Sequence, residues 1–149
     1  MWFAFWETMI NAAIFASVIL SALGLYIASY FTLVYYGLLE ANTRLVPRVC
    51  QLEERSCKTV LSTRYARIFG VPNSLLGVLY YLFVVIVLMG GFTDASISLA
   101  LVAVAWFTVA AGIGLTYALF FMIRIPCPLC LTGHTINLAL AILVTILLG

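Results

Sequence analysis

Charged side chains are scarce in this sequence: Lys, Arg, Asp and Glu together make up 8% of its 149 residues. In a soluble domain about a quarter of the residues carry charge, so this shortage excludes an ordinary soluble protein. The net charge of +2 is too small to suggest a protein that binds nucleic acid. Because 66% of the residues are hydrophobic, the composition predicts an integral membrane protein.

Several other features are also missing. No basic stretch precedes the first apolar run, which begins Met1-Trp2-Phe3-Ala4, so we expect no cleaved signal peptide. The sequence shows no soluble domain, no long-period repeat and no low-complexity tail. We therefore predict one transmembrane domain that spans residues 1–149.

Four apolar segments are each long enough to cross a bilayer, which takes about 20 helical residues. They run over Thr8 to Leu39, Pro72 to Met89, Ser96 to Ile123, and Leu129 to Leu148. The predicted fold class is an all-α membrane protein with a four-transmembrane-helix bundle. The first segment is longer than needed, so we expect it to tilt or to project from the membrane. Small residues recur along it at helical spacing and predict close helix contact: Ala13, Ser17, Ser21, Gly24 and Ala28.

The stretch from Glu40 to Val71 is the one long polar segment, and it contains six of the seven Lys and Arg residues. Within it, apolar residues repeat at i, i+4, i+7 and i+8: Leu61, Tyr65, Ile68 and Phe69. This pattern predicts a short amphipathic helix lying in the interface, with Ser62 as its N-cap. Such a helix would cover the mouth of the bundle.

The four cysteines form two pairs that are far apart in sequence, Cys50 with Cys57 and Cys127 with Cys130. With four spans, the first and third connections emerge on the same side of the membrane, so the two pairs can meet. Pro126 and Pro128 flank Cys127, the first cysteine of the Cys-x-x-Cys pair, and Pro128 suits the first turn of a helix. Free backbone N–H groups and the helix dipole would then favour the reactive thiolate.

Three kinds of cysteine chemistry fit this arrangement. Four thiolates can hold zinc, but a proline-flanked helix start without a surrounding polar knuckle argues against a metal site. Two structural disulfides are a second interpretation, although a two-residue loop gains little from such a link. A thiol–disulfide relay is favoured, with the charged loop as a mobile carrier. The alternative is a non-catalytic membrane subunit with a metal site or structural disulfides.

A relay of this kind needs a terminal acceptor, and the inner pair borders lipid, so we expect a membrane-soluble small molecule. Cys130, His134 and Asn137 follow one another at i, i+4 and i+7 along the last span. Asn73 opens the second span at comparable depth and shares a face with Gly77 and Tyr80. Polar residues inside a membrane are functional candidates by default, although His134 and Asn137 also suit helix packing.

Three segments carry a resemblance to a known family: Cys57-Lys58-Thr59-Val60-Leu61-Ser62-Thr63-Arg64-Tyr65-Ala66-Arg67-Ile68-Phe69-Gly70, Asn73-Ser74-Leu75-Leu76-Gly77, and Cys127-Pro128-Leu129-Cys130. The sequence resembles the vitamin K epoxide reductase family, including prokaryotic homologues that make disulfides with a quinone. The match covers about Cys50 to Asn137. This resemblance implies a four-helix bundle around a pocket for a quinone of the ubiquinone or menaquinone type.

The resemblance also implies roles for individual residues. Cys127 and Cys130 become the active pair, with Cys130 facing the quinone, while Cys57 exchanges with Cys127 and Cys50 meets the partner. Asn73 matches a residue that hydrogen-bonds a quinone carbonyl, and His134 stands where the animal enzymes carry a tyrosine. Ser62 and Thr63, with Leu61 beside them, match a position that flanks the site. A separate thioredoxin-fold protein is the implied electron donor, and quinone reduction with disulfide formation is implied rather than epoxide reduction.

The two sides of the membrane differ in charge. Every Lys and Arg falls on the cysteine side, six in the long loop plus Arg124, whereas the opposite side carries Glu7 and Asp94. The positive-inside rule therefore predicts a cytoplasmic cysteine face. The family resemblance implies the opposite, extracytoplasmic face. Cytoplasmic disulfide formation makes physical sense chiefly in hyperthermophiles, whose intracellular proteins are often rich in disulfides.

Overall fold

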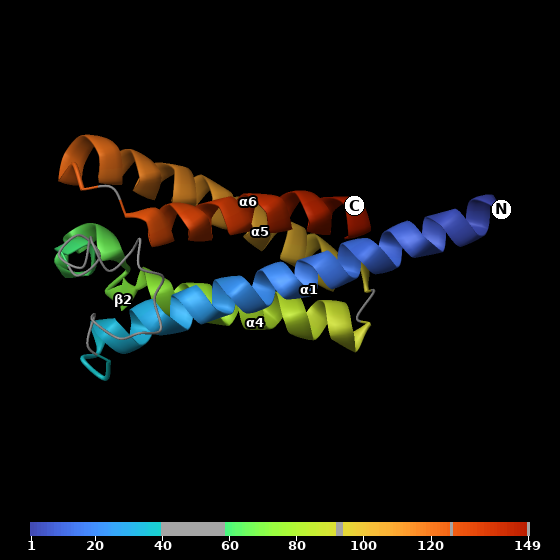
Figure 1. The fold of residues 1–149 in the computed structure, drawn as a ribbon, viewed down its shortest axis with the longest axis horizontal. Coiled ribbons are helices and arrows are strands. Elements are labelled where there is room, and N and C mark those ends of the chain that lie inside the picture. The colour runs from blue at the N-terminus through green and yellow to red at the C-terminus, as the bar shows by residue number, and fades with distance from the viewer. Residues whose placement is uncertain (40–58, 92–93, 126, 149) are drawn as a thin grey trace.

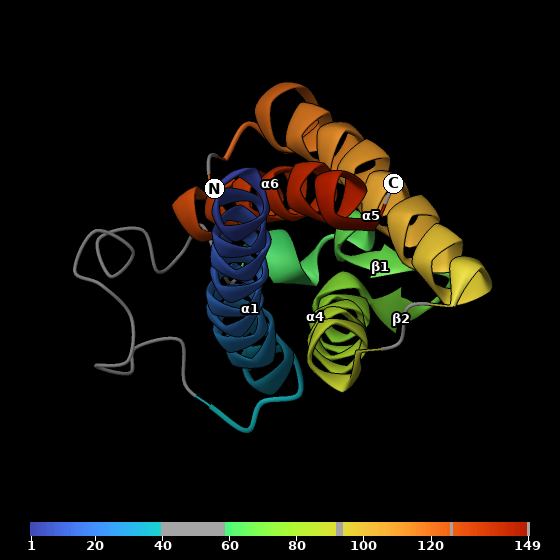
Figure 2. The ribbon, with the colours of Figure 1, turned by 90° about the vertical axis from the view of Figure 1, so that its right-hand side faces the viewer.

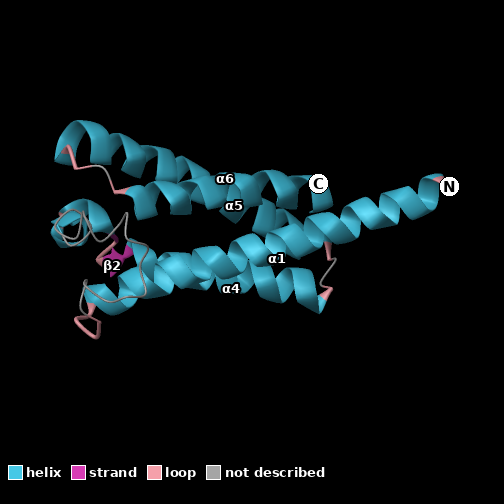
Figure 3. Cartoon of the chain, in the orientation of Figure 1, coloured by secondary structure: helices cyan, strands magenta, loops and turns pink. Residues whose placement is uncertain are grey.

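The computed structural model describes residues 1–39, 59–91, 94–125 and 127–148. Within these residues, four helices are long and apolar enough to cross a membrane. They are α1 (Trp2–Tyr35), α4 (Asn73–Gly90), α5 (Ala95–Tyr117), which continues into the π-helical turn η2 (Ala118–Ile123), and α6 (Pro128–Leu148) (Figures 1 and 3). The predicted four-helix membrane bundle is confirmed, and α4, α5 with η2, and α6 match the predicted spans to within one residue at each end.

Viewed along the bundle, the helices form an incomplete ring (Figure 2). α1 packs against α4 and α6, and α6 packs against α5, whereas α4 and α5 touch each other at few points. Aliphatic and aromatic side chains from all four helices fill the centre, with Val84, Leu101, Leu140 and Val144 completely buried. The ring is thus tight along three of its four sides and looser between α4 and α5.

The small-residue stripe of α1 faces the bundle as predicted, because Ser17, Ser21, Gly24 and Ala28 are all buried. The Ser17 hydroxyl donates to the carbonyl oxygen of Ala13 one turn earlier, which satisfies a polar group in an apolar setting. The 34 residues of α1 span about 51 Å at 1.5 Å per residue. This exceeds the roughly 30 Å apolar layer of a bilayer, and the N-terminal end of α1 projects beyond the other helices (Figure 1).

The predicted amphipathic helix is wrong beyond Ser62. Residues 59–62 form one helical turn, and the chain continues as the 3₁₀-helix η1 (Arg64–Ala66) and a hairpin of β1 (Arg67–Ile68) and β2 (Val71–Pro72). Phe69 and Gly70, between the strands, both have positive φ, which is typical of the type I′ turn that closes two-residue hairpins. This turn ends the helical periodicity. We call residues 59–72 the lid segment.

Ser62 is not an N-cap either. Its hydroxyl donates to the carbonyl oxygen of Thr59, 2.7 Å away, and the Thr63 hydroxyl makes the equivalent bond to Val60. Hydroxyl side chains compete with the helix for backbone groups in this way, so two in succession favour the end of a turn. Leu61, Tyr65 and Ile68 share the predicted apolar face, whereas the prediction is wrong for Phe69, which is 99% exposed at the turn of the hairpin.

Candidate functional site

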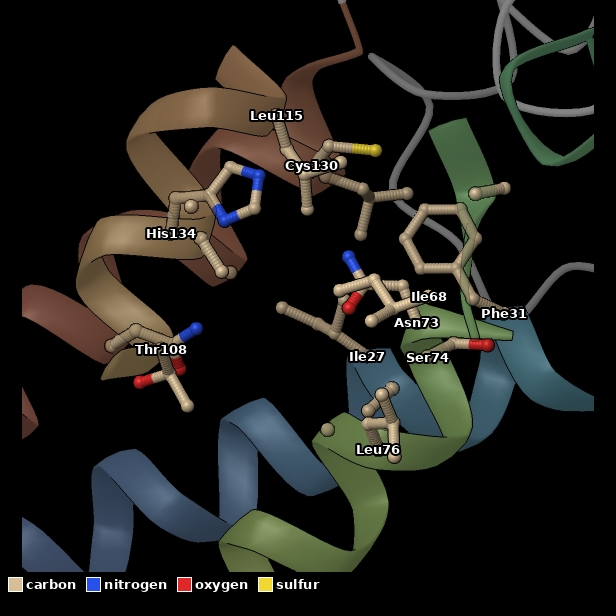
Figure 4. A pocket seen from close by; sticks show the side chains of 18 of the residues that line it. Ile27, Phe31, Ile68, Asn73, Ser74, Leu76, Thr108, Leu115, Cys130 and His134 are labelled. Carbon is tan, nitrogen blue, oxygen red and sulfur yellow. The ribbon is translucent and has the colours of Figure 1, made fainter. Parts of the chain in front are cut away.

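A cavity of about 210 Å³ lies between the helices beneath the lid segment. All four spanning helices contribute to its walls, and the lid segment closes one end with Val60, Leu61, Tyr65, Ala66 and Ile68. Most of the lining is aliphatic or aromatic, and a few polar side chains point inward among them (Figure 4). An apolar cavity with a small number of placed polar groups is typical of a small-molecule site.

Two contacts hold the lid segment over the cavity. The Tyr65 hydroxyl donates to the sulfur of Met122 in η2, with 3.0 Å between the atoms. The Arg67 guanidinium lies 5.5 Å from the ring centroid of Tyr35 near the end of α1, a distance at which a cation and an aromatic ring attract. The lid segment is therefore attached to both sides of the cavity.

Cys127 directly precedes α6 and Cys130 lies in its first turn, because Pro128 begins the helix as predicted. The carbonyl oxygen of Cys127 accepts the N–H of Leu131, and its sulfur accepts the N–H of Cys130 at 3.4 Å. Cys127 thus occupies the cap of α6, where a side-chain acceptor satisfies a backbone N–H that the helix leaves free. The sulfur atoms of the two cysteines lie 2.6 Å apart.

The two cysteines differ in their surroundings. Cys130 lines the cavity and is partly exposed. Cys127 has no exposed surface and lies in a cluster with Tyr30, Phe31 and Leu119, against which Val60 and Leu61 of the lid segment also pack. One sulfur therefore faces the cavity, whereas the other lies beneath the start of the lid segment.

Asn73 and His134 project into the cavity from different helices (Figure 4). Asn73 is the first residue of α4, directly after Pro72, so the helix start fixes its depth. His134 lies one turn beyond Cys130 on α6, beside Gly112 of α5. A Cβ atom at residue 112 would come within 2.9 Å of the His134 Nδ1, so the glycine provides the space that the imidazole occupies.

Asn137 also lines the cavity, and it bonds to a residue that the sequence analysis did not single out. The Tyr81 hydroxyl on α4 donates to Asn137 Oδ1 at 2.7 Å and so joins two helices across the cavity. Ser74, next to Asn73, contributes a buried hydroxyl with no hydrogen-bond partner among the described residues. Tyr81, Phe31 and Gly112 were missed because single aromatic residues and glycines in apolar spans give no signal of their own.

The other predicted site residues are arranged as follows. Leu61 lines the cavity, whereas Ser62 and Thr63 do not and direct their hydroxyls to backbone carbonyls. Cys50 and Cys57 lie outside the described residues. The structure therefore brings together Cys130, Asn73, His134, Asn137 and Leu61 around one cavity, with Cys127 behind Cys130.

A comparison with protein families identifies the family to which the chain belongs. The model of the vitamin K epoxide reductase family matches residues 15–145, which include every described element of the site. Members of this family are membrane oxidoreductases that couple thiol chemistry to quinones in general. Because the match extends over most of the sequence, the chain belongs to the vitamin K epoxide reductase family.

Proposed function

We propose that this chain forms disulfides by passing electrons from a thioredoxin-fold partner through its two cysteine pairs to a membrane quinone. The observation that carries the proposal is the position of Cys130. It is one half of a Cys-x-x-Cys pair, and its side chain lines a largely apolar cavity enclosed by membrane-spanning helices. An electron acceptor dissolved in the bilayer would meet a reactive sulfur there.

The relay between the pairs proceeds by thiol–disulfide exchange. A reduced partner attacks the Cys50–Cys57 disulfide at Cys50 and leaves both outer cysteines as thiols. The Cys57 thiolate then attacks the Cys127–Cys130 disulfide at Cys127, forming a Cys57–Cys127 disulfide and releasing Cys130 as a thiolate. Attack of Cys50 on Cys57 releases Cys127, so the outer disulfide is restored and the inner pair holds two thiols.

The lid segment supports this route. Val60 and Leu61 lie in the cluster that buries Cys127, and Cys57 is three residues before Val60 in the sequence. Three residues of extended chain span at most about 11 Å, so the chain length is compatible with exchange between Cys57 and Cys127. The cap position of Cys127 supports its role as the sulfur under attack, because Cys130 is released as a thiolate at the positive end of α6.

The cavity residues fit a quinone of the ubiquinone or menaquinone type. A bound quinone would accept the two electrons and two protons that the Cys127–Cys130 dithiol loses on forming its disulfide. Asn73, His134 and Asn137 are the side chains that would donate hydrogen bonds to its carbonyl oxygens, because each lines the cavity. Leu61 and Phe31 would pack against the ring, whereas Ser62 and Thr63 would shape the lid segment without touching the ligand.

The loosely packed side of the bundle, between α4 and α5, would let a quinone enter the cavity from the bilayer. The cavity lining includes Leu76 of α4 and Phe107 of α5, which are 37% and 68% exposed. These helices touch at few points, so an apolar tail would pass between them into the surrounding lipid. The ring of the acceptor would then lie beside Cys130 while its tail stays in the membrane.

A cytoplasmic cysteine face remains our proposal for the orientation. Arg64 and Arg67 of the lid segment and Arg124 after η2 gather at the cysteine end of the bundle. Glu7 and Asp94 belong to the other end, where α1 begins and α4 turns into α5. This charge asymmetry favours the cytoplasmic side of the membrane for the cysteine end of the bundle.

A reconstituted assay tests the proposed function. The purified chain in lipid vesicles receives a reduced thioredoxin-fold protein and a short-tailed quinone, and quinone absorbance is followed with time. We expect turnover by the wild-type chain and none by Cys130→Ala, whereas Thr145→Val, which alters a helix contact away from the cavity, retains it. Stoichiometric zinc together with no turnover would favour a non-catalytic membrane subunit instead.

A further inference from the structure

We propose that Tyr81 is a positioning residue, which orients the Asn137 amide so that its NH₂ group donates a hydrogen bond to a carbonyl oxygen of the bound quinone. This inference rests on the proposed function and extends it to the end of the cavity away from the lid segment. Tyr81 itself belongs to the cavity lining, but its hydroxyl proton is engaged by Asn137, so it would act on the acceptor through that amide.

The Tyr81–Asn137 hydrogen bond fixes which end of the amide faces Tyr81. The tyrosine hydroxyl donates to Oδ1 at 2.7 Å, so the carbonyl end of the amide is occupied. The NH₂ group makes no further hydrogen bond to any described residue, and Asn137 is a partly exposed member of the cavity lining. An amide held in this way presents only donors to the cavity, and a quinone offers only acceptors.

The position of the Tyr81 ring is itself constrained. Tyr81 is 4% exposed, and its ring lies against Gly24 of α1 so closely that a Cβ atom at residue 24 would overlap it. Tyr80, the preceding residue, packs beside it with 5.3 Å between ring centroids. The hydroxyl of Tyr81 therefore reaches Asn137 from a ring that has little freedom to move.

A purely structural bond between helices is the competing interpretation, and the structure contains a matched example. The indole N–H of Trp106 on α5 donates to the Thr145 hydroxyl on α6 at 3.0 Å. Neither residue lines the cavity, so this bond joins two helices without bordering any ligand. It provides a control for the loss of one side-chain hydrogen bond between membrane helices.

The test compares Tyr81→Phe with Thr145→Val in the vesicle assay, using two probes of similar shape. One is 2-methyl-1,4-naphthoquinone as the substrate, and the other is 2-methylnaphthalene, which lacks carbonyl groups, as a competitive inhibitor. We expect Tyr81→Phe to raise the KM for the quinone roughly three- to tenfold, the range for one neutral hydrogen bond, with little change in kcat. The inhibition constant of the hydrocarbon should not change, and Thr145→Val should alter neither constant.

A second variant separates orientation from simple contact. Asn137→Leu should raise the KM by a similar factor, and the double variant with Tyr81→Phe should be no worse than Asn137→Leu alone, because both act through one amide. If Tyr81→Phe weakens the binding of the quinone and of the hydrocarbon by similar factors, the inference is overturned in favour of a structural role. An unchanged KM would also overturn it while the proposed function stands, and a wild-type chain that reduces no quinone would remove both.

Discussion

The sulfur of Cys130 lies 2.6 Å from the sulfur of Cys127, yet only Cys130 borders the cavity. Cys127 is completely buried and caps α6, where its sulfur accepts the Cys130 N–H. A pair with one sulfur toward the cavity and the other toward the lid segment suits a transfer in which each cysteine meets a different partner.

Removing the outer resolving cysteine should trap the exchange between pairs. Without Cys50, the Cys57–Cys127 disulfide has no thiol to restore Cys57, so we expect Cys50→Ala to accumulate this link. Non-reducing peptide mapping by mass spectrometry measures it. The control is Cys50→Ala combined with Cys127→Ala, which should show no such link, and a link from Cys57 to Cys130 instead would contradict the assigned order of attack.

Leu61 should protect Cys127. This leucine packs with the cluster around Cys127 and also lines the cavity, so Leu61→Ala removes apolar cover from the sulfur. We expect alkylation of Cys127 by N-ethylmaleimide to accelerate about fivefold, as local opening becomes easier. Phe69→Ala is the matched control, because Phe69 lies in the same lid segment but is 99% exposed and does not line the cavity. Equal rates in the two variants would argue against a protective role of the lid segment.

Gly112 should be required for the position of His134. In Gly112→Ala the new methyl group would meet the imidazole at 2.9 Å, so either the ring or α5 must shift. We expect a loss of about 1–3 kcal/mol in unfolding free energy, as for an overpacked interior, and a raised KM for quinone. Gly114→Ala adds the same methyl group two residues later in open space, so it should leave both quantities close to wild type.

The proposed orientation predicts opposite labelling of two exposed positions. Phe69 at the tip of the hairpin is 99% exposed, and Asp94 before α5 is exposed at the other end of the bundle. Single cysteines are introduced by Phe69→Cys or Asp94→Cys in a chain whose own cysteines are replaced by serine. In intact cells, a membrane-impermeant maleimide should label residue 94 and not residue 69. The reverse result would assign the cysteine face to the exterior.

The spans were predictable because their apolar runs are long and end at strong signals. Pro72 and Pro128 mark the starts of α4 and α6 to within one residue. Gly91, with a φ of +64°, marks the end of α4. The ends of α1 were harder to predict. It begins at Trp2 rather than Thr8, and it ends at Tyr35 rather than Leu39 because Gly37, with a φ of +71°, turns the chain out of the helix.

The lid segment shows where periodicity fails as a guide. Leu61, Tyr65 and Ile68 do share one face, and all three line the cavity. Their spacing fits an α-helix equally well, however. Nothing in the sequence indicates that Phe69, beside Gly70, adopts a positive φ. Hydrogen bonds from hydroxyls to the backbone and a two-residue turn decided the local structure, and neither has a strong sequence signature.

The candidate site was predictable where polar residues stand out against an apolar background. Asn73, Cys130, His134 and Asn137 were identified for that reason, and the cavity includes all four. Tyr81 and Gly112 were not, because their importance comes from neighbours on other helices: the Asn137 amide for one and the His134 ring for the other. Such pairings exist only after the helices have packed.

One measurement tests the central claim most directly, that the inner dithiol alone delivers its electrons to an acceptor in the cavity. A chain with Cys50→Ser and Cys57→Ser is reduced, freed of reductant and mixed anaerobically with 2-methyl-1,4-naphthoquinone. The account predicts that each chain reduces one quinone and ends with a Cys127–Cys130 disulfide. No reduction, or equal reduction after Cys130→Ser is added, would contradict it.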